Sequence, residues 1–187
     1  MLASASPRRL SLLRQIGLEP DAVLAADLDE TPLPSETPRL LALRLAAAKA
    51  ALIASREASA FVIAADTVVA VGRRILPKVE GGADGRACLE LLSGRAHRVL
   101  TGVAVAAPGG RTASRLVESK VRFKRLTRAE VEHYLASGQG VGKAGGYAIQ
   151  GLAGAYVTAL QGSYSGVVGL PLYETVNLLT GLGFRRP

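Results

Sequence analysis

The chain begins with Leu2-Ala3-Ser4-Ala5-Ser6-Pro7-Arg8-Arg9-Leu10, and this stretch predicts how its first two elements are joined. The residues before Ser6 can form a short strand, and serine is a favourable helix N-cap. Pro7 suits the first helical position because that position needs no N–H donor. The helix that follows has one apolar side and ends near Gly17, the residue type that most often follows a helix C-terminus. We therefore expect a strand–turn–helix unit.

Two arginines, Arg8 and Arg9, fall in the first turn of this helix. The helix dipole disfavours positive charge there by roughly 0.3–1 kcal/mol for each side chain. A bound anion would compensate, because free backbone N–H groups, two guanidinium groups and the hydroxyls of Ser4 and Ser6 suit a polyphosphate. These residues alone are equally compatible with a capped surface helix whose arginines are solvated.

The composition indicates an ordinary folded protein. Its 187 residues, 49% hydrophobic and 20% charged, fit one domain (1–187) or two small lobes. The single cysteine, Cys88, excludes an internal disulfide framework and is typical of a reducing cytoplasm. No run of 18 uncharged apolar residues occurs, so we expect a cytoplasmic protein that does not span a membrane.

The net charge of +8 favours anionic partners. Tryptophan is absent, aromatic residues make up only 4% of the chain, and the basic residues are scattered without aromatic neighbours. This pattern argues against a groove for single-stranded nucleic acid, and it fits a small phosphorylated substrate at least as well. We expect no nucleic-acid partner.

An acidic segment, residues 27–31, precedes three prolines and is predicted to be a loop that carries Glu30. A solvated acidic turn is the alternative interpretation of this segment. Thr37 and Pro38 then start a long predicted helix that extends to about Ser55. Lys49 interrupts its apolar positions and is expected at the polar edge of the helix.

Residues 61–65 form a continuous apolar run, which is typical of a strand buried on both faces. The run ends at Asp66-Thr67, and the chain continues extended into a hairpin that places Lys78 beside Asp66. A carboxylate at the end of a buried strand is costly unless it has a partner, so Asp66 is a candidate functional residue. A capping or turn aspartate is the alternative.

Alternating helix and strand signals continue along the chain and predict an α/β fold with a mixed sheet. The expected strands are 22–25, 99–106, 115–123, 147–149 and 155–160, and the expected later helices are 83–92, 127–136 and 171–179.

Two other motifs are set aside. The segment 138–144 resembles a P-loop, but Ser137 and Ala144 stand where glycine and serine or threonine are required. His97 and His133 are the only histidines and lie far apart in the sequence, which argues against a histidine metal site or a Ser-His-Asp triad. Any metal is expected to be a hard cation, Mg²⁺ or Mn²⁺, held by carboxylates.

The remaining candidates form a coherent set of cations, hydroxyls and carboxylates. Cationic and hydroxyl donors could hold a polyphosphate, while Glu30 and Asp66 could hold a cation and orient water. No side chain stands out as a covalent nucleophile. The chemistry that these residues support is direct attack of water on phosphorus.

Five further stretches belong together as a set of motifs: Ser4-Ala5-Ser6-Pro7-Arg8-Arg9, Ala65-Asp66-Thr67, Ser93-Gly94 with His97 and Thr101, Lys143-Ala144-Gly145-Gly146-Tyr147-Ala148-Ile149-Gln150-Gly151, and Val168-Gly169-Leu170-Pro171. Through these motifs, the chain resembles the Maf family of nucleoside triphosphate pyrophosphatases over essentially its whole length. The family is related in fold to the inosine triphosphate pyrophosphatases and is linked in bacteria to septum formation and to the removal of modified nucleotides.

The resemblance implies an α/β fold with a mixed twisted sheet, flanking helices and two lobes around a central cleft, usually in a homodimer. It also implies cleavage of a nucleoside triphosphate between the α- and β-phosphates, with a divalent cation. The family's proton acceptor falls on Asp66, which with Glu30 would hold the metal. Lys49 and Lys78 match two lysines expected to face the phosphates, and Lys78 is included among the catalytic residues.

Three positions indicate the branch of the family. Arg8, Thr67 and Gln150 resemble the branch that acts on dTTP and UTP, and the branch that acts on 7-methyl-GTP differs at all three. Together with Ser4, Ser6, Arg9 and Lys49, they form the expected substrate-binding set. The residue after Lys78 departs from the family pattern, because Val79 replaces the usual proline.

Two competing interpretations remain open. The first is a non-catalytic regulator of cell division that binds a nucleotide or a protein. The second is a nucleic-acid-binding module, which is suggested only by the net charge.

Overall fold

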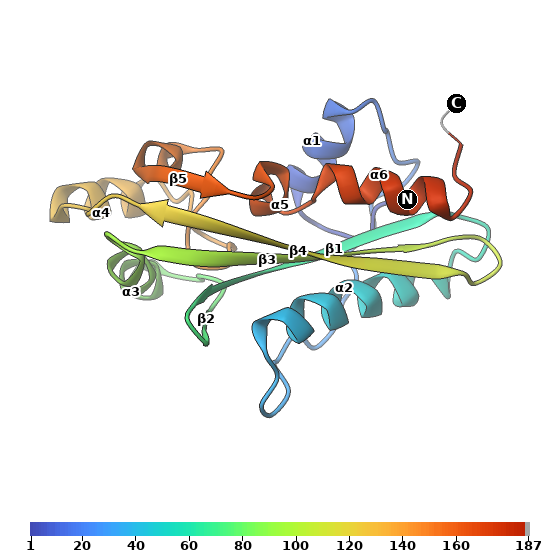
Figure 1. The fold of residues 1–187 in the computed structure, drawn as a ribbon, viewed down its shortest axis with the longest axis horizontal. Helices are drawn as coiled ribbons and strands as arrows, with labels where there is room; N and C mark the ends of the chain where they lie inside the picture. Colours follow the sequence, from blue (N-terminus) through green and yellow to red (C-terminus); the bar gives the residue numbers. More distant parts are fainter. Residues whose placement is uncertain (186–187) are drawn as a thin grey trace.

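The computed structural model describes residues 1–185, which form a long twisted sheet with helices on both faces (Figure 1). The strands are β1 (Val62–Val71), β2 (Arg74–Leu76), β3 (Ala96–Ala106), β4 (Thr112–Phe123) and β5 (Val157–Gln161). The helices are α1 (Pro7–Gln15), α2 (Pro38–Ala54), α3 (Gly82–Leu92), α4 (Arg128–Ala136), α5 (Tyr164–Val168) and α6 (Leu172–Gly181), and a 3-10 turn spans Leu152–Tyr156. The predicted α/β fold class is confirmed.

The five strands lie in the order β2-β1-β3-β4-β5, and each neighbouring pair is antiparallel. Parallel pairing within the described residues is confined to Leu2, which bridges both Val23 and Ile63. The strand predicted at 22–25 is therefore only a bridge at Val23. Its short pairing with Leu2 nevertheless fixes the N-terminal segment against β1.

Side chains on β1 alternate between two cores. Val62, Ala64, Val68 and Ala70 belong to the clusters that pack beneath α2, whereas the odd-numbered positions of the strand face the larger core on the opposite side. Successive strand residues point to opposite faces. Asp66 consequently faces α2, and Thr67 faces the side on which α1 and α5 lie.

The close contact between α2 and the sheet depends on Gly102, which pairs with Asp66 across β1 and β3. A Cβ atom at Gly102 would lie 2.2 Å from the carbonyl oxygen of Ala42. The absence of a side chain therefore lets α2 lie directly on β3. This contact brings the buried side of α2, including Lys49, to the strand that carries Asp66.

Three expectations from the sequence are wrong in detail. Asp66 lies in the middle of an unbroken ten-residue strand instead of at a strand end. Lys49 is 6% exposed and is not at a polar edge, because its ammonium group pairs with the buried carboxylate of Asp66 and with Glu30. Residues 147–149 are buried but not a strand, since the Tyr134 hydroxyl accepts the Ala148 N–H that a neighbouring strand would have paired.

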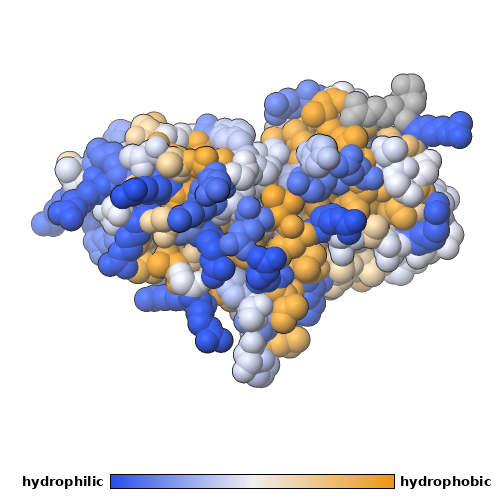
Figure 2. Space-filling model, viewed as in Figure 1, coloured by the Kyte–Doolittle hydropathy of each residue, from blue (hydrophilic) through white to orange (hydrophobic). Residues whose placement is uncertain are grey.

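The face shown in Figure 2 has hydrophobic surface mainly over the half that carries α2 and α6, and the end that carries α4 is largely hydrophilic. Leu40 on α2 and Tyr173 on α6 are among the exposed large hydrophobic residues. Within residues 1–185, no helix combines the length and the apolar character needed to cross a membrane.

Candidate active site

Every site residue predicted from the sequence lines one cleft of about 470 Å³. The N-terminal segment, the acidic loop, α2, β1, the segment after β2 and the segment 141–150 all contribute to its wall. The predicted residues are Ser4, Ser6, Arg8, Arg9, Glu30, Lys49, Asp66, Thr67, Lys78 and Gln150.

The cleft opens at a gap along one edge of β1. The edge strand β2 pairs with β1 only along Val69–Val71, and the N-terminal segment bridges it only at Ile63. Between these contacts, Asp66 and Thr67 pair with β3 on one side and border the cleft on the other. The interrupted edge explains how a mid-strand aspartate comes to line a cleft.

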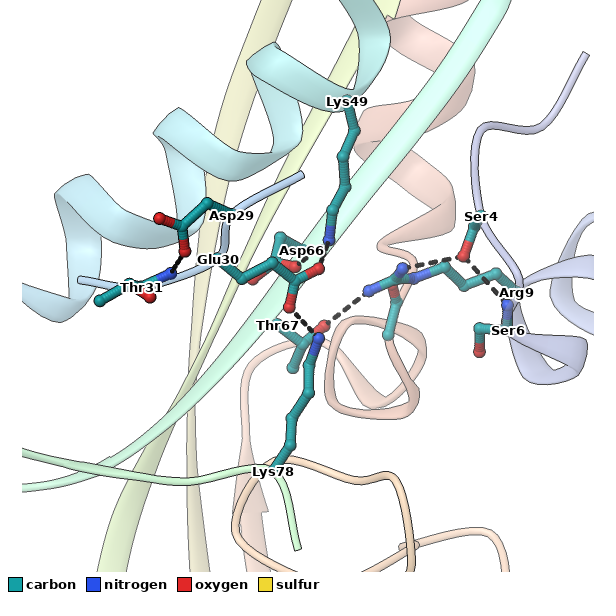
Figure 3. Close-up of polar contacts among 11 residues, drawn as sticks. Ser4, Ser6, Arg9, Asp29, Glu30, Thr31, Lys49, Asp66, Thr67 and Lys78 are labelled. Carbon is teal, nitrogen blue, oxygen red and sulfur yellow. Dashed lines mark hydrogen bonds and ion pairs between the residues drawn. The ribbon is translucent and has the colours of Figure 1, made fainter. Parts of the chain in front are cut away.

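Four charged side chains that line the cleft form a network (Figure 3). The Lys49 ammonium lies 2.6 Å from Asp66 Oδ1 and 2.5 Å from Glu30 Oε1. Lys78 forms an ion pair with the other oxygen of Glu30. Asp66 is 3% exposed, so Lys49 supplies the positive charge that a buried carboxylate requires.

The acidic loop takes part in this network through Glu30 and is not merely a solvated turn. Burial raises the pKa of Glu30, but hydrogen bonds from Lys49 and Lys78 lower it by more, so its pKa lies below the ordinary value. Glu30 is therefore an ionised carboxylate at neutral pH.

The same carboxylates fit a hard divalent cation. Glu30 and Asp66 come from separate elements and already share one cation, the Lys49 ammonium. Mg²⁺ is usually held by one or two carboxylates together with water and substrate phosphates. Within residues 1–185, no cluster of three or more His, Cys, Asp or Glu side chains forms a complete metal cage.

Arg9 occupies the opposite face of β1, among oxygen acceptors. Its guanidinium donates to Ser4 Oγ at 3.0 Å, to the Gly169 carbonyl at 2.8 Å and to Thr67 Oγ1 at 3.5 Å. Thr67 in turn lies 3.0 Å from the hydroxyl of Thr101. These contacts fix the guanidinium plane at the cleft wall.

Ser6 stands at the predicted N-cap of α1 but does not cap the helix with its side chain. Ser4 Oγ instead accepts the backbone N–H of Ser6. The hydroxyl oxygen of Ser6 is buried and has no hydrogen-bond partner among the described residues. Because an unpaired buried hydroxyl is costly, Ser6 Oγ fits a position that a ligand completes.

Arg8 and Gln150 also line the cleft. Arg8 is half-buried, and its Nε donates weakly to the Val168 carbonyl at 3.4 Å. Gln150 is exposed, and within residues 1–185 its side-chain amide makes no hydrogen bond. Both side chains can therefore contact a ligand without breaking a strong internal interaction.

Two cleft features were missed by the sequence analysis. Lys143 lines the cleft, although its segment was considered only as a rejected P-loop and as part of a family motif. His97 is buried, and its Nε2 lies 2.7 Å from the hydroxyl of Tyr147, which also lines the cleft. Burial lowers the pKa of His97 from 6.5 to about 4, so the ring is neutral at pH 7.

Comparison with known proteins decides the family. The family model described as "Maf-like protein" matches residues 1–182. The chain belongs to the Maf family. The resemblance inferred from the sequence motifs is thereby confirmed.

Curated Maf relatives are similar along nearly the whole chain. A protein of Caulobacter vibrioides named "dTTP/UTP pyrophosphatase" is 68% identical over 185 residues, which cover 99% of this chain and 96% of that protein. A protein of Mesorhizobium japonicum with the same name is 60% identical, with 99% and 92% of the two chains covered. A solved structure, a "Nucleoside-triphosphatase / dITP/XTP pyrophosphatase" from Mycobacterium abscessus, is 17% identical and has a TM-score of 0.41 over 67% of this chain and 72% of that chain.

Proposed function

We propose that this protein hydrolyses dTTP and UTP between the α- and β-phosphates, releasing a nucleoside monophosphate and pyrophosphate. The observation that carries the proposal is the joining, in one cleft, of a carboxylate–lysine network with serine and arginine donors. The names of the Caulobacter and Mesorhizobium relatives support the same activity and the same pyrimidine substrates.

In the proposed mechanism, Arg9, Ser4 and Ser6 bind phosphate oxygens. The hydroxyl of Ser6 is a donor without an internal partner, and the Arg9 guanidinium is fixed by Ser4, Thr67 and the Gly169 carbonyl. Lys78 is half-exposed at the cleft, so it can leave Glu30 to neutralise charge on the transferred phosphoryl group.

Asp66 acts as the general base. Its carboxylate accepts a proton from water as the water oxygen attacks the α-phosphorus, and the bond from that phosphorus to the bridging oxygen breaks to release pyrophosphate. Lys49 donates to Asp66 Oδ1 and therefore orients the carboxylate.

Glu30 and Asp66 are the residues proposed to hold Mg²⁺ or Mn²⁺, because both carboxylates already converge on one cation. When bound, such a cation supplies Lewis-acid polarisation of the phosphoryl oxygens and neutralises part of the triphosphate charge.

Arg8, Thr67 and Gln150 are proposed to set the preference for pyrimidines. The unpaired amide of Gln150 can offer both a donor and an acceptor to the edge of a uracil or thymine ring. Thr67 lines the cleft beside Arg9, whose guanidinium donates to the Thr67 hydroxyl at 3.5 Å.

The test is pyrophosphate release from dTTP, UTP, CTP, dGTP and 7-methyl-GTP, with Mg²⁺ or Mn²⁺ and with excess EDTA. We expect turnover of dTTP and UTP, little turnover of the others, and none with EDTA. Turnover of 7-methyl-GTP in preference to the pyrimidines would contradict the proposed branch. Absence of turnover on every nucleotide would favour the non-catalytic regulator.

The proposal also includes a cytoplasmic location and a homodimer, both taken from the sequence and the family resemblance. Light scattering on the purified protein tests the homodimer, since a monomer at micromolar concentration would contradict it.

A further inference from the structure

The cleft contains a second group of cations that the carboxylate network does not neutralise. Lys49 and Lys78 are both paired with carboxylates, whereas Arg8 and Lys143 have no acidic partner within residues 1–185. Lys143 Nζ donates only to the Val141 carbonyl, at 3.2 Å within its own loop. Both cations line the cleft.

The two unpaired cations are close enough to influence one another. Burial lowers the pKa of Lys143, and the positive charge of Arg8 lowers it further. Burial also lowers the pKa of Arg8. Partly desolvated like charges disfavour each other, so this part of the cleft is electrostatically incomplete until an anion enters it.

The loop that carries Lys143 is fixed to the segment that carries Lys78. The Gly142 N–H donates to the Val79 carbonyl at 2.8 Å, and the Val79 N–H donates to the Lys143 carbonyl at 3.2 Å. Lys78 and Ala144 form an antiparallel bridge. The position of Lys143 is therefore set relative to the carboxylate–lysine network, although neither Lys143 nor Lys78 lies in a helix or a long strand.

Tight packing reinforces this connection. A Cβ atom at Gly145 would lie 2.9 Å from the side chain of Val69, and one at Gly146 would lie 2.8 Å from the side chain of Val79. Both glycines have φ of +68°, a conformation that other residues rarely adopt. The loop thus packs closely against β1 and the Lys78 segment. This packing can hold the Lys143 ammonium at a fixed place.

We propose that Lys143 and Arg8 form a binding site for the two terminal phosphates of the triphosphate, the part that leaves as pyrophosphate. This inference rests on the proposed function and assigns a role to a residue that the sequence left without one. A neutral pyrimidine would leave both charges uncompensated, whereas the terminal phosphates carry the negative charge that two unpaired cations require. Arg8 then contributes to phosphate binding in addition to its part in base selection.

The experiment compares wild type with Lys143→Met and Lys143→Arg. Methionine keeps most of the apolar stem without the charge, and arginine keeps the charge. For each protein, KM and kcat for dTTP are measured, together with inhibition by inorganic pyrophosphate and by dTMP. A lost charged hydrogen bond to phosphate corresponds to about a tenfold weaker interaction or more.

For Lys143→Met, we expect KM for dTTP and the inhibition constant of pyrophosphate to rise at least about tenfold, while inhibition by dTMP changes less than about twofold. Lys143→Arg should retain most of the pyrophosphate affinity. Unchanged pyrophosphate inhibition in Lys143→Met, or weakened dTMP inhibition alone, would overturn the inference.

Lys120→Ala is the matched control, because Lys120 is exposed on β4 and does not line this cleft. Lys120→Ala should leave KM, kcat and both inhibition constants unchanged. A similar loss of pyrophosphate affinity in Lys120→Ala would show that the effect comes from the overall charge of the protein, and it would overturn the inference. Thermal melting confirms that each variant is folded. Failure of wild type to hydrolyse any nucleotide would refute the proposed function, and in that case direct calorimetric binding of pyrophosphate still tests Lys143.

Discussion

The buried ion pair between Lys49 and Asp66 gives a prediction that separates folding from catalysis. The three variants are Asp66→Asn, Lys49→Met and the double variant. The ammonium of Lys49 lies 2.6 Å from Asp66 Oδ1, and the two residues are 6% and 3% exposed. Each single change leaves one member of the pair without its partner, but the double change removes both charges.

The expected magnitudes differ because Lys49 has two partners and Asp66 has one ion-pair partner among the described residues. Lys49→Met leaves Asp66 buried and unpaired, which costs about 3–5 kcal/mol of unfolding free energy. Asp66→Asn leaves Lys49 paired with Glu30, so it should cost only about 1–3 kcal/mol. The double variant should be less destabilised than the sum of the single changes by about 1–3 kcal/mol.

The assay combines urea unfolding at pH 7.5, followed by circular dichroism, with pyrophosphate release from dTTP. Asp66→Asn should reduce kcat by about 10²–10⁴, because the proposed general base is lost. The double variant should recover stability but not turnover. Glu118→Gln is the control, because it removes the surface ion pair between Glu118 and Arg39, and it should change stability by less than about 1 kcal/mol.

Two results would refute this reasoning, one for the energetic coupling of the pair and one for the catalytic role of Asp66. Stability changes that add within about 0.5 kcal/mol would show that Lys49 and Asp66 are not energetically coupled. Wild-type turnover in a folded Asp66→Asn variant would remove Asp66 from the role of general base.

Three further predictions test the support around the cleft. Because the pKa of folded His97 is lowered from 6.5 to about 4, the unfolded chain binds its proton more readily, and stability present above pH 6.5 is lost as pH falls toward 4. Between pH 7 and pH 4, urea unfolding should therefore show that wild type loses about 3 kcal/mol more unfolding free energy than His97→Leu. Equal losses in the two proteins would contradict the lowered pKa of His97. Gly102→Ala should destabilise the protein by about 1–3 kcal/mol in the same assay, because its Cβ would lie 2.2 Å from the Ala42 carbonyl oxygen. An unchanged urea midpoint would show that α2 can move away from β3 at no cost in stability. Gln150→Glu should change the ratio of kcat/KM between UTP and CTP more than the inhibition constant of pyrophosphate, and equal losses on all nucleotides would exclude a role in base selection.

Local signals in the sequence were sufficient for most helix starts. Pro7 begins α1, and Thr37 accepts the Leu40 N–H at the start of α2. A capping box joins Thr127 and Glu130 at the start of α4, the helix predicted at 127–136. These features depend on residues three or four positions apart, so they can be predicted from the sequence without knowledge of the tertiary fold.

The burial of Lys49 and the conformation of the segment 147–149 could not be predicted from such local signals. Lys49 breaks the apolar pattern of its helix, and only pairing with Asp66 on a distant strand makes its burial favourable. Residues 147–149 have the composition of a strand, but the Tyr134 hydroxyl takes the Ala148 N–H. In both cases, a side chain remote in sequence overrides the local preference.

The pairing of charges within the cleft connects the fold to the proposed chemistry. The formal charges of Glu30 and Asp66 are balanced by those of Lys49 and Lys78. Arg8, Arg9 and Lys143 also line the cleft, but no carboxylate lies within ion-pairing distance of them in the described residues. In the proposed binding mode, the α-phosphorus lies near Asp66 and the terminal phosphates lie near Lys143, so the substrate supplies the negative charge that these cations lack. Carboxylates distributed evenly among all these cations would neutralise the cleft and weaken its attraction for a polyphosphate. The proposed function therefore depends on which cations of the cleft lack a carboxylate partner, as much as on any single residue.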